Sequence, residues 1–432
     1  MKLRSYINNV SALQAFQVMR FSVLILIGII LVKTGYSTDE IGVYELFFFL
    51  ANVVSFFWVM GLNNGLMSYY PSLTEEKKQL MLFNIAILLL ALGFIAGLIL
   101  YLARHAVFEM VGKVDYLGYL IIYMILSAPA NFTEYTYLLK GQSSKIIIYG
   151  MVIFALQLIL IISGVMLDFS IENLLKLMVG WALFKFVWFA QLIIRKEKLK
   201  LDFKLQYVFL IFSLPLIFQM LLGNGMEYVD GFLVNVFYDE TAFAQFRYGA
   251  RELPLVTILV GAVSTALIPV AVNNMADALS EVKQKIKRLM NFLFPISMVL
   301  MLISPLVFPM VYSNDYLISA QLFNVYLLVI SSRLFMPQVV LFAKHENVTL
   351  MISALIELIV NIGLSLLLLK YYGMIGIAWA TVIAYLVNKL ILLTVAWRKY
   401  AIKPSAYIDL KTYAAWLSVL LISYYLSTYY LY

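Results

Sequence analysis

Uninterrupted apolar segments of about 20 residues recur along the whole chain, and they constrain the fold more than any other feature. The stretch LFNIAILLLALGFIAGLILYL, which begins at Leu82, is one example. A helix of this length crosses a hydrocarbon core of about 30 Å. A membrane barrel would instead show segments of about ten residues with alternating polarity. The sequence therefore predicts an all-α integral membrane protein.

The first apolar segment follows the basic start MKLR, a combination that also occurs in secretion signals. It is longer than the apolar core of a signal peptide, and no small-residue cleavage site follows it. We therefore expect it to be retained as the first membrane helix.

Cysteine and histidine are too scarce to build a metal centre. The chain has no cysteine and two histidines, His105 and His345, which lie far apart in the sequence. Disulfides and thiolate metal sites are thereby excluded, and a histidine metal cluster is not expected.

Thirteen apolar segments are long enough to span a membrane. We expect helices near residues 13–33, 41–62, 81–103, 115–139, 146–167, 171–195, 207–237, 241–270, 289–312, 316–343, 348–370, 374–397 and 410–430. The last segment is rich in tyrosine, so it fits either a thirteenth span or a helix lying in the membrane interface.

Basic residues are distributed unequally between alternate loops. With the N-terminus placed in the cytoplasm, the loops on that side carry twenty basic residues and the opposite loops carry four, namely Lys33, Arg104, Lys113 and Lys370. Because cytoplasmic loops attract lysine and arginine, we predict a multi-pass protein of the plasma (inner) membrane with a cytoplasmic N-terminus. This asymmetry and the anionic lipid headgroups account for the net charge of +8, so no nucleic-acid partner is expected.

The most basic loop, RKEKLKLDFK from Arg195, separates six expected helices from the remainder. It predicts an N-terminal six-helix bundle over residues 1–200 and a C-terminal six-helix bundle over 201–403. Residues 404–432 would form one additional transmembrane helix. A faint repeat, AFQ at Ala15 and IFQ at Ile217, relates the two halves. Paired bundles of this kind usually enclose a central cavity.

Thirteen ionisable residues lie inside the expected spans. They are the bases Arg20, Lys176, Lys185, Arg247, Arg251, Arg333 and Lys389 and the acids Glu45, Glu134, Glu227, Asp230, Glu252 and Glu357. Each charge at the bilayer centre costs about 2.5 to 3.5 kcal/mol, so most of them must face the protein interior or water. Mutual ion pairing explains a part of the set. The residues nearest to mid-membrane predict a hydrated, charged cavity: Lys185, Arg251, Arg333, Glu357 and Lys389.

Enzyme chemistry finds little support in the sequence. The loops reach only about 10 to 20 residues, and the chain has no paired-carboxylate metal motif, phosphate-cradling glycine loop or nucleophile elbow. A membrane glycosyltransferase or polymerase therefore remains an alternative only. A channel would need a repeated pore motif, so a carrier fits best.

Three stretches resemble polysaccharide flippases of the multidrug/oligosaccharidyl-lipid/polysaccharide exporter (MOP) superfamily. YVDGFLVNVFYDETAFAQFRYGARELPLVTILVGAVSTALIPVAV from Tyr228 is similar to that superfamily's helices seven and eight. GLNNGLMSYYPSLTEEKK from Gly61 is similar to its first cytoplasmic loop, and YGMIGIAWATVIAYLV from Tyr372 to its helix twelve. Gly231 departs from the pattern, because many relatives carry a basic residue there.

The resemblance implies a fold like that of the multidrug exporters (MATE), with two six-helix bundles that open alternately to either side of a central cavity. It implies a flippase that moves an oligosaccharide on polyprenyl pyrophosphate from the cytoplasmic to the outer leaflet, for O-antigen or capsule biosynthesis. The partners would be this substrate and membrane lipids, with polysaccharide polymerases and glycosyltransferases as further candidates. A cation-coupled drug antiporter of the same superfamily is the alternative, although acidic cavities are typical of that group.

The cationic residues inside the spans are the candidate substrate site. Arg247 and Arg251 lie one helical turn apart on one face, so both guanidinium groups could grip one diphosphate, with Arg20 approaching from the other bundle. Neutralisation by Glu252 is the structural alternative. The remaining candidates for the cavity are Lys185, Arg333 and Lys389.

A second group of residues predicts a cation site. Glu357 and Asn361 share a helix face, Thr381 lies on the next helix and Asp230 on helix seven. This set resembles a sodium site of lipid flippases in the superfamily, and oxygen ligands suit a hard cation. The alternative is that Glu357 pairs with Lys389 or Arg333. No cofactor is expected beyond Na⁺ or H⁺ as a coupling ion, and the membrane potential alone would assist export of an anion.

Overall fold

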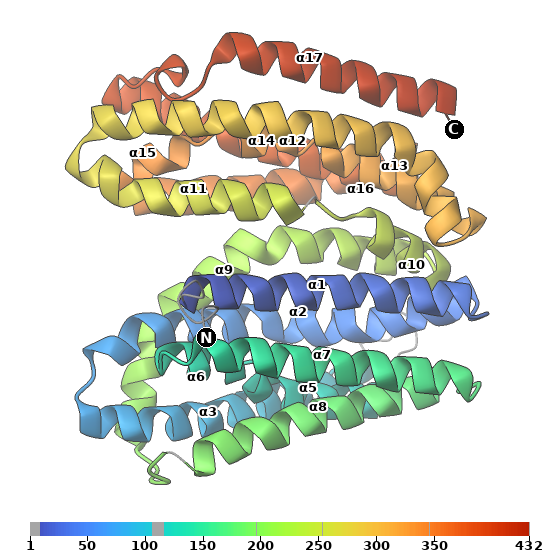
Figure 1. The fold of residues 1–432 in the computed structure, drawn as a ribbon, viewed down its shortest axis with the longest axis vertical. Helices are drawn as coiled ribbons and strands as arrows, with labels where there is room; N and C mark the ends of the chain where they lie inside the picture. Colours follow the sequence, from blue (N-terminus) through green and yellow to red (C-terminus); the bar gives the residue numbers. More distant parts are fainter. Residues whose placement is uncertain (1–8, 106–115, 196, 253, 345, 432) are drawn as a thin grey trace, which may run out of the picture. The chain divides into compact units, whose positions relative to one another are not determined.

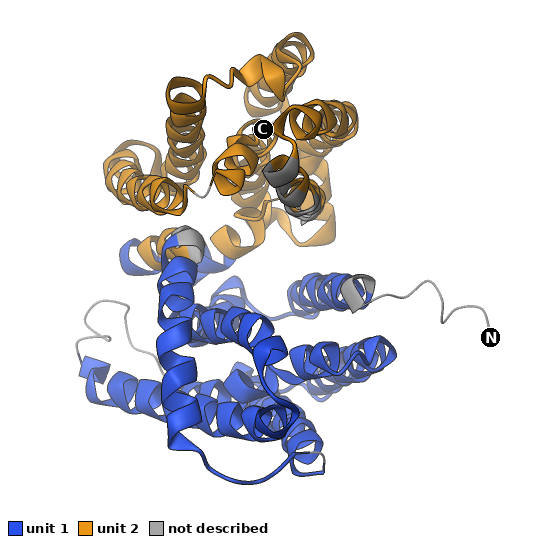
Figure 2. Cartoon of the chain, turned by 90° about the vertical axis from the view of Figure 1, so that its left-hand side faces the viewer, with its two compact units in different colours: residues 1–224, 235–244 blue, residues 225–234, 245–432 orange. Residues whose placement is uncertain are grey.

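The computed structural model describes residues 9–105, 116–195, 197–252, 254–344 and 346–431, and within these ranges the chain consists of helices and loops without a strand (Figure 1). The chain forms two compact units (Figure 2). Unit 1 comprises residues 1–224 and 235–244, and unit 2 comprises residues 225–234 and 245–432.

Unit 1 holds the helices that precede the central basic loop. They are α1 (Asn9–Lys33), α2 (Thr38–Tyr69), η2 (Tyr70–Ser72), α3 (Glu75–Leu102), α5 (Leu117–Ala130), α6 (Thr133–Leu139), α7 (Ser143–Met166) and α8 (Ile171–Ile194). The start of α2 is fixed by a capping box, in which Ser37 and Glu40 satisfy each other's backbone N–H groups. The expected helix at 115–139 is divided into α5 and α6, and Pro129 lies in the last turn of α5.

Helix α9 (Phe203–Phe237) contributes to both units. Its first half packs on α2, where the ring of Tyr69 lies 5.9 Å from that of Phe209 and 5.1 Å from that of Phe212. Phe209 and Ile217 belong to one buried apolar cluster with side chains of α2, α3, α5 and α8. The boundaries between the units therefore fall inside α9, after residues 224 and 234, and after residue 244 in the following helix, and not in the basic loop at 195–204.

The basic loop is held on α3 by one buried amide. Asn84 donates a hydrogen bond from Nδ2 to the carbonyl of Lys200 at 2.9 Å, and its Oδ1 accepts one from the backbone N–H of Asp202 at 2.8 Å. Gln206 donates to the backbone carbonyl of Asn84 at 3.0 Å. Residues 200–206 are thus attached to α3 within unit 1.

Unit 2 begins within α9 and α10 (Glu240–Gly249) and continues to the end of the chain. Its further helices are α11 (Pro254–Asn273), α12 (Met275–Val311), η3 (Asn314–Tyr316), α13 (Leu317–Leu327), α14 (Ile330–Arg333), α15 (Pro337–Ala343), α16 (Asn347–Tyr400), η4 (Pro404–Ala406), α17 (Leu410–Leu426) and η5 (Ser427–Leu431). Residues 404–432 belong to this unit, because α17 packs on α12.

Helix α16 is a hairpin of two membrane-length limbs. Gly373, with φ of 61° and ψ of −143°, interrupts the helix. Glycine adopts such a backbone conformation more easily than any other residue, because it has no side chain. Hydrogen bonds across the two limbs join Asn361 to Thr381 and Asn388 to Ser353. These pairings show that the limbs run antiparallel, as expected for separate helices at 348–370 and 374–397.

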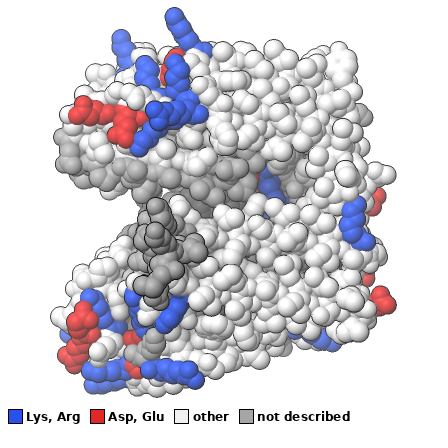
Figure 3. Space-filling view, viewed as in Figure 1, with Lys and Arg blue, Asp and Glu red and all other residues white. Residues whose placement is uncertain are grey.

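In the described ranges, all thirteen expected segments are mainly helical, but those at 115–139, 241–270 and 316–343 are each divided into shorter helices. Ten helices among the described residues are long and apolar enough to cross a membrane, and one of them is the folded α16. Large apolar side chains such as Phe94, Ile159 and Leu306 are exposed on the outer faces of the helices. On the face shown in Figure 3, most of the charged side chains lie toward the two ends of the helices seen in Figure 1, and the surface between them is mostly uncharged. These features indicate a multi-pass membrane protein.

Candidate functional site

Asp230 lies at the centre of a buried polar cluster in unit 2. Its side chain, on α9, is in a residue only 2% exposed. Oδ2 accepts hydrogen bonds from the hydroxyl of Thr381 and, at 2.9 Å, from the hydroxyl of Tyr326. Oδ1 accepts one from Nδ2 of Asn361 at 3.2 Å, and the same amide donates to the hydroxyl of Thr381 at 3.0 Å. Four residues from α9, α13 and both limbs of α16 thus meet at one carboxyl group.

Neutral groups alone satisfy this carboxyl group in the described ranges. No lysine, arginine or histidine there forms an ion pair with Asp230, and its hydrogen-bond donors are two hydroxyls and one amide. A buried carboxylate without a counter-ion is costly, even when it is hydrogen-bonded. The cluster therefore has one negative charge for which the described part of the chain supplies no ion-pair partner.

The donor set of this cluster fits a hard cation. A carboxylate, a hydroxyl and an amide carbonyl are oxygen ligands of the kind that Na⁺ and other hard cations take. Oδ1 of Asn361 is buried and has no hydrogen-bond partner in the described ranges. Three of the four residues predicted for the cation site, Asp230, Asn361 and Thr381, are thus in mutual contact.

Glu357 lies apart from that contact set. Among the described residues it forms no hydrogen bond with the cluster, and the charges that act on it are those of Arg333, Lys389 and Glu252. Lys389 donates a hydrogen bond to Oε1 of Gln338 at 3.0 Å. Glu357 and Lys389 therefore belong to a mixed group of charges around Arg333.

Arg333 and Glu252 form a two-pronged ion pair in unit 2. Nε and an Nη of Arg333 donate to the two carboxylate oxygens of Glu252 at 3.0 and 2.7 Å. The guanidinium group also donates to the hydroxyl of Tyr385 at 2.8 Å and lies 4.2 Å from the centre of its ring. This geometry shows that Arg333 and Glu252 are each other's ion-pair partner within the protein.

Arg247 and Arg251 are half-buried and lie close together, but Arg251 is not on the helix that carries Arg247, so the two do not share one helix face as expected. Arg251 follows the end of α10, in the link to α11, so the expected helix at 241–270 is divided there. Its Nε donates to the carbonyl of Arg247 at 3.0 Å, and its guanidinium lies 5.5 Å from the ring centre of Tyr248. Glu252 forms its ion pair with Arg333. The alternative expectation, in which Glu252 neutralises Arg251, is therefore not observed among the described residues.

Unit 1 has its own buried charges. Glu134 on α6 and Lys185 on α8 are buried, and Arg20 on α1 lies within electrostatic reach of both. Lys185 donates to Oδ1 of Asn131 at 3.3 Å, and its Nζ lies 4.1 Å from the ring centre of Trp181. The charges of Arg20 and Lys185 outnumber that of Glu134 in this group, which favours an anion.

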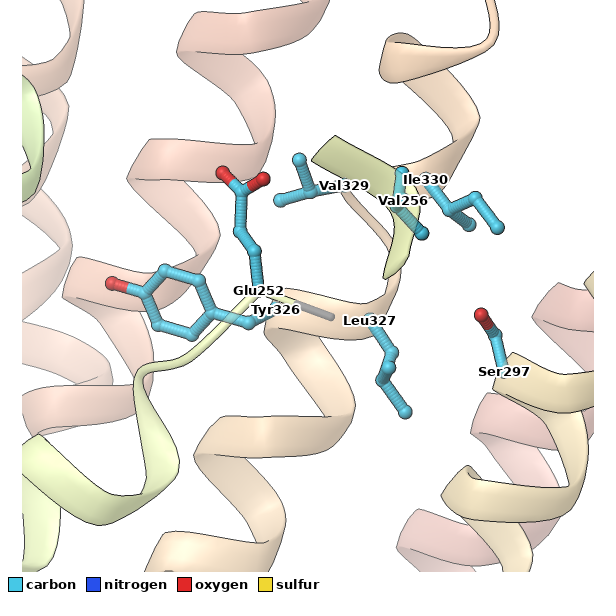
Figure 4. A pocket seen from close by; sticks show the side chains of 7 residues that line it. All are labelled: Glu252, Val256, Ser297, Tyr326, Leu327, Val329 and Ile330. Atoms are coloured by element: carbon cyan, nitrogen blue, oxygen red, sulfur yellow. The ribbon is translucent and has the colours of Figure 1, made fainter. Parts of the chain in front are cut away.

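A small cavity lies between α13, α11 and α12 in unit 2. Its volume is about 10 Å³, and it is lined by Glu252, Val256, Ser297, Tyr326, Leu327, Val329 and Ile330. Figure 4 shows Glu252 and Tyr326 on one side and Ser297 on the other, with the carboxylate and the phenol hydroxyl directed away from Ser297. Space of this size holds about one water molecule.

Sequence reasoning did not identify several partners in these sites. Tyr326 and Tyr385 are uncharged residues within apolar helices, and Asn131 lies in the break between α5 and α6. No spacing rule marks them, because their partners are 96, 52 and 54 residues away. Only the packing of the helices reveals them.

A sequence profile of the family described as polysaccharide biosynthesis protein matches residues 36–321, which is more than half of the chain. The chain belongs to this family. A comparison with curated protein sequences finds no match.

Solved structures of transporters share the fold of this family member over nearly the whole chain. Lipid II flippase MurJ, in an inward closed conformation, has a TM-score of 0.70 at 19% identity, covering 95% of this chain and 91% of that one. An inward-facing multidrug resistance MATE family transporter of the MOP superfamily has a TM-score of 0.63 at 15% identity, with coverages of 94% and 99%. A MOP superfamily transporter from Pyrococcus furiosus, described by the reverse polarity of its binding pocket, has a TM-score of 0.55 at 14% identity, with coverages of 95% and 94%. The chain therefore shares the fold of these transporters.

Proposed function

We propose that the protein is a flippase of lipid-linked oligosaccharides. It moves a repeat unit on polyprenyl pyrophosphate from the cytoplasmic to the outer leaflet of the plasma (inner) membrane by alternating access. The product would serve polysaccharide biosynthesis, with O-antigen and capsule as the pathways of interest and polymerases and glycosyltransferases as neighbouring partners. Membership in a polysaccharide biosynthesis family and a MOP-superfamily fold support this function.

The observation that carries the proposal is the pair formed by Arg247 on α10 and Arg251 just after this helix. Arg251 makes one hydrogen bond to a backbone carbonyl and stacks on an aromatic ring, and it forms no ion pair with a carboxylate among the described residues. Its remaining N–H donors are suited to the oxygens of a diphosphate, which guanidinium groups bind with two parallel hydrogen bonds. Arg247 and Arg251 would hold the pyrophosphate from unit 2, and Arg20 and Lys185 supply positive charge within unit 1.

The polar cluster around Asp230 is our candidate for ion coupling. We propose that Asp230, Asn361 and Thr381 hold a hard monovalent cation, Na⁺ being the first ion to test and H⁺ the second. When bound, the ion would neutralise the buried carboxylate. Glu357 is left out of the proposed ligand set because its electrostatic partners are Arg333 and Lys389.

Flipping is tested in vesicles that contain the purified protein and a fluorescent polyprenyl-pyrophosphate sugar. We expect Arg251→Ala to abolish flipping, because each charged contact contributes about 1.5 to 3 kcal/mol to binding. Arg251→Lys should be strongly impaired, since lysine keeps the charge but loses the planar fork. Arg104→Ala, a change at an arginine that stacks on Tyr101 outside the candidate site, is the control. Wild-type flipping by Arg251→Ala would refute the proposed site.

A multidrug antiporter is the second candidate, because an exporter of this kind shares the fold. Two buried acids, Asp230 and Glu134, are the feature that favours it. The same vesicles separate the two functions when a cationic dye replaces the lipid. Dye efflux without lipid flipping would favour the antiporter, and growth of sugar chains from added precursors would favour an enzyme.

Orientation is a separate part of the proposal, with the N-terminus in the cytoplasm. Lys283, Lys285 and Lys287 lie near the start of α12, where Lys287 pairs with Asp409 at 2.7 Å. Since the chain has no native cysteine, single cysteines report the side directly. In intact cells, Asp239→Cys should react with an impermeant maleimide and Lys285→Cys should not. Labelling of Lys285→Cys from outside would show that the proposed orientation is wrong.

A further inference from the structure

Helix α13 connects the two candidate sites of unit 2 through one residue near its end. Tyr326 donates its hydroxyl to Oδ2 of Asp230 at 2.9 Å. The ring of the same residue packs edge-to-face on Phe246, with ring centres 6.4 Å apart and an interplanar angle of 76°. Such aromatic contacts are favourable at this separation. Phe246 directly precedes Arg247 on α10, so Tyr326 contacts both the carboxylate of the cation site and the helix that carries Arg247 and leads into Arg251.

The start of α13 is also attached to α10. A Cβ atom added at Gly249 would lie 2.4 Å from the carbonyl oxygen of Ser319, so the backbones of the two helices are in close contact there. Ser319 donates to the carbonyl of Gln245 at 2.7 Å, and the side chain of Gln245 donates to the carbonyl of Asp315 at 2.8 Å. A movement of α13 would therefore be transmitted to α10.

Tyr326 binds Oδ2 of Asp230, the oxygen that a cation placed beside the hydroxyl of Thr381 would also contact. Oδ2 accepts two hydroxyl donors, Tyr326 and Thr381, and two is the number of lone pairs on a carboxylate oxygen. Thr381 can keep a place at the site when its own oxygen acts as a ligand, and so can Asn361 through its amide carbonyl. A cation bound at Oδ2 would therefore displace the phenol of Tyr326.

The structure provides space next to Tyr326. The cavity of about 10 Å³ borders its ring, and Ser297 on the opposite wall has a buried hydroxyl without a hydrogen-bond partner in the described ranges (Figure 4). Close-packed interiors seldom permit a ring to shift without such a void. Glu252, which holds Arg333, lines the same cavity, so a displaced ring would also approach this ion pair.

We propose that Tyr326 is the coupling residue of unit 2: its hydroxyl competes with a cation for Asp230, and α13 passes its displacement to the arginine-bearing helix α10. The inference rests on the proposed function, and in particular on the cation site. Tyr326 acts through Asp230 and Phe246, so we regard it as a positioning residue that links ion binding to pyrophosphate binding.

The first experiment measures Na⁺ binding by thermal shift of the full chain in nanodiscs, with choline as the inert cation. Tyr326→Phe removes a hydrogen bond that stabilises the ion-free carboxylate, so half-maximal stabilisation should occur at a Na⁺ concentration about tenfold lower than in wild type. Tyr407→Phe is the matched control, because Tyr407 is a buried tyrosine of the same unit whose hydroxyl has no partner in the described ranges. Asp230→Asn should abolish the response.

The second experiment measures the affinity for inorganic pyrophosphate with and without saturating Na⁺. Linkage requires that two coupled ligands change each other's affinity by one factor. In wild type and in Tyr407→Phe, we expect saturating Na⁺ to change the affinity for pyrophosphate by at least about threefold. This factor should fall to about one in Tyr326→Phe and in Phe246→Leu, which removes the ring contact but leaves the hydroxyl of Tyr326 in place. The Na⁺ affinity of Phe246→Leu should remain within about twofold of wild type, which shows that its cation site is intact.

The outcomes separate the two levels of the proposal. If wild type responds to Na⁺ and Tyr326→Phe retains both the wild-type ion affinity and the wild-type coupling factor, the role of Tyr326 is refuted and the cation site stands. If neither wild type nor Asp230→Asn responds to Na⁺, the cation site and the coupling both fail. Flipping of the lipid-linked sugar by that wild-type protein would still support the flippase.

Discussion

Asp230 and Glu252 are two poorly exposed acids of the same unit, and their surroundings differ in kind. Glu252 meets a guanidinium group through two hydrogen bonds, whereas Asp230 meets only hydroxyl and amide donors. An acid paired with an arginine already has its counter-charge within the fold. An acid surrounded by neutral donors keeps its charge available to a solute. The comparison teaches that burial alone does not mark a functional acid, and that the identity of its hydrogen-bond donors separates a structural role from a binding role.

The largest effect is expected when the Glu252 pair is broken. Arg333→Ala leaves Glu252, a side chain 17% exposed, without its arginine, and should lower the free energy of unfolding by about 2 to 3 kcal/mol. The double variant Arg333→Ala/Glu252→Gln should recover most of this loss, because it removes the uncompensated charge. Thermal unfolding in one detergent compares the three proteins. Additive losses in the double variant would show that the two residues do not act as a pair.

A smaller effect is expected when the fork is lost but the charge is kept. Arg333→Lys should destabilise the protein by about 1 kcal/mol, since an ammonium group cannot hold both carboxylate oxygens and Tyr385 in the same plane. The same thermal unfolding assay applies, with the exposed Arg398→Lys as the matched control. Equal stability of Arg333→Lys and wild type would mean that charge alone explains the pair.

Asp230→Asn should give a still smaller change in stability when no coupling ion is added. The substitution removes a buried charge that the described residues do not neutralise, so the free energy of unfolding should change by less than about 1 kcal/mol. Glu252→Gln, the same type of change at the paired acid, should be the more destabilising of the two because it leaves Arg333 without its carboxylate. If Asp230→Asn proves as destabilising as Glu252→Gln, the distinction between the two acids is wrong.

Glu346 extends the comparison to an acid outside the spans, where the smallest effect is expected. Hydrogen bonds from Lys399, Thr349 and Tyr400 lower the pKa of Glu346 from 4.5 to about 2. A lowered pKa in the folded state means that the stabilisation is present above pH 4.5 and is lost as the pH falls through about 2. Glu346→Gln should therefore reduce the pH dependence of unfolding between pH 4.5 and pH 2. An unchanged pH profile in this variant would contradict the assignment.

The helices were largely predictable from the sequence, because bilayer thickness imposes a minimum length on every apolar span. The described part of every expected segment is mainly helical, although three of the segments are divided. The breaks between helices were harder to predict. Pro129 lies inside an expected span, and the helix divides just after it, at residues 131 and 132. The sequence alone does not distinguish such a proline from one that a continuous membrane helix tolerates.

The candidate sites were only partly predictable. Asn361 and Thr381 were assigned to one site with Asp230 from the resemblance to a sodium site of lipid flippases. The hairpin turn at Gly373 explains why Asn361 and Thr381 meet, because it brings equivalent depths of its two limbs together. The bidentate pair of Arg333 with Glu252 bridges 81 residues and depends on how helices are rotated against each other, which no local pattern encodes. Tyr326 is uncharged and lies in an apolar helix, so the sequence did not indicate it as a site residue.

The shared helix α9 also sets an order of events during synthesis. Unit 1 includes residues 203–224 and 235–244, and its apolar cluster contains Phe209 and Ile217. A ribosome that has released only the first six helices has therefore not yet supplied all of that cluster. We expect a fragment that stops in the basic loop, after Lys200, to expose apolar surface of α2 and to be recognised by membrane quality control. A fragment that continues through Ala244 contains every residue of unit 1 and should persist longer in pulse-chase experiments.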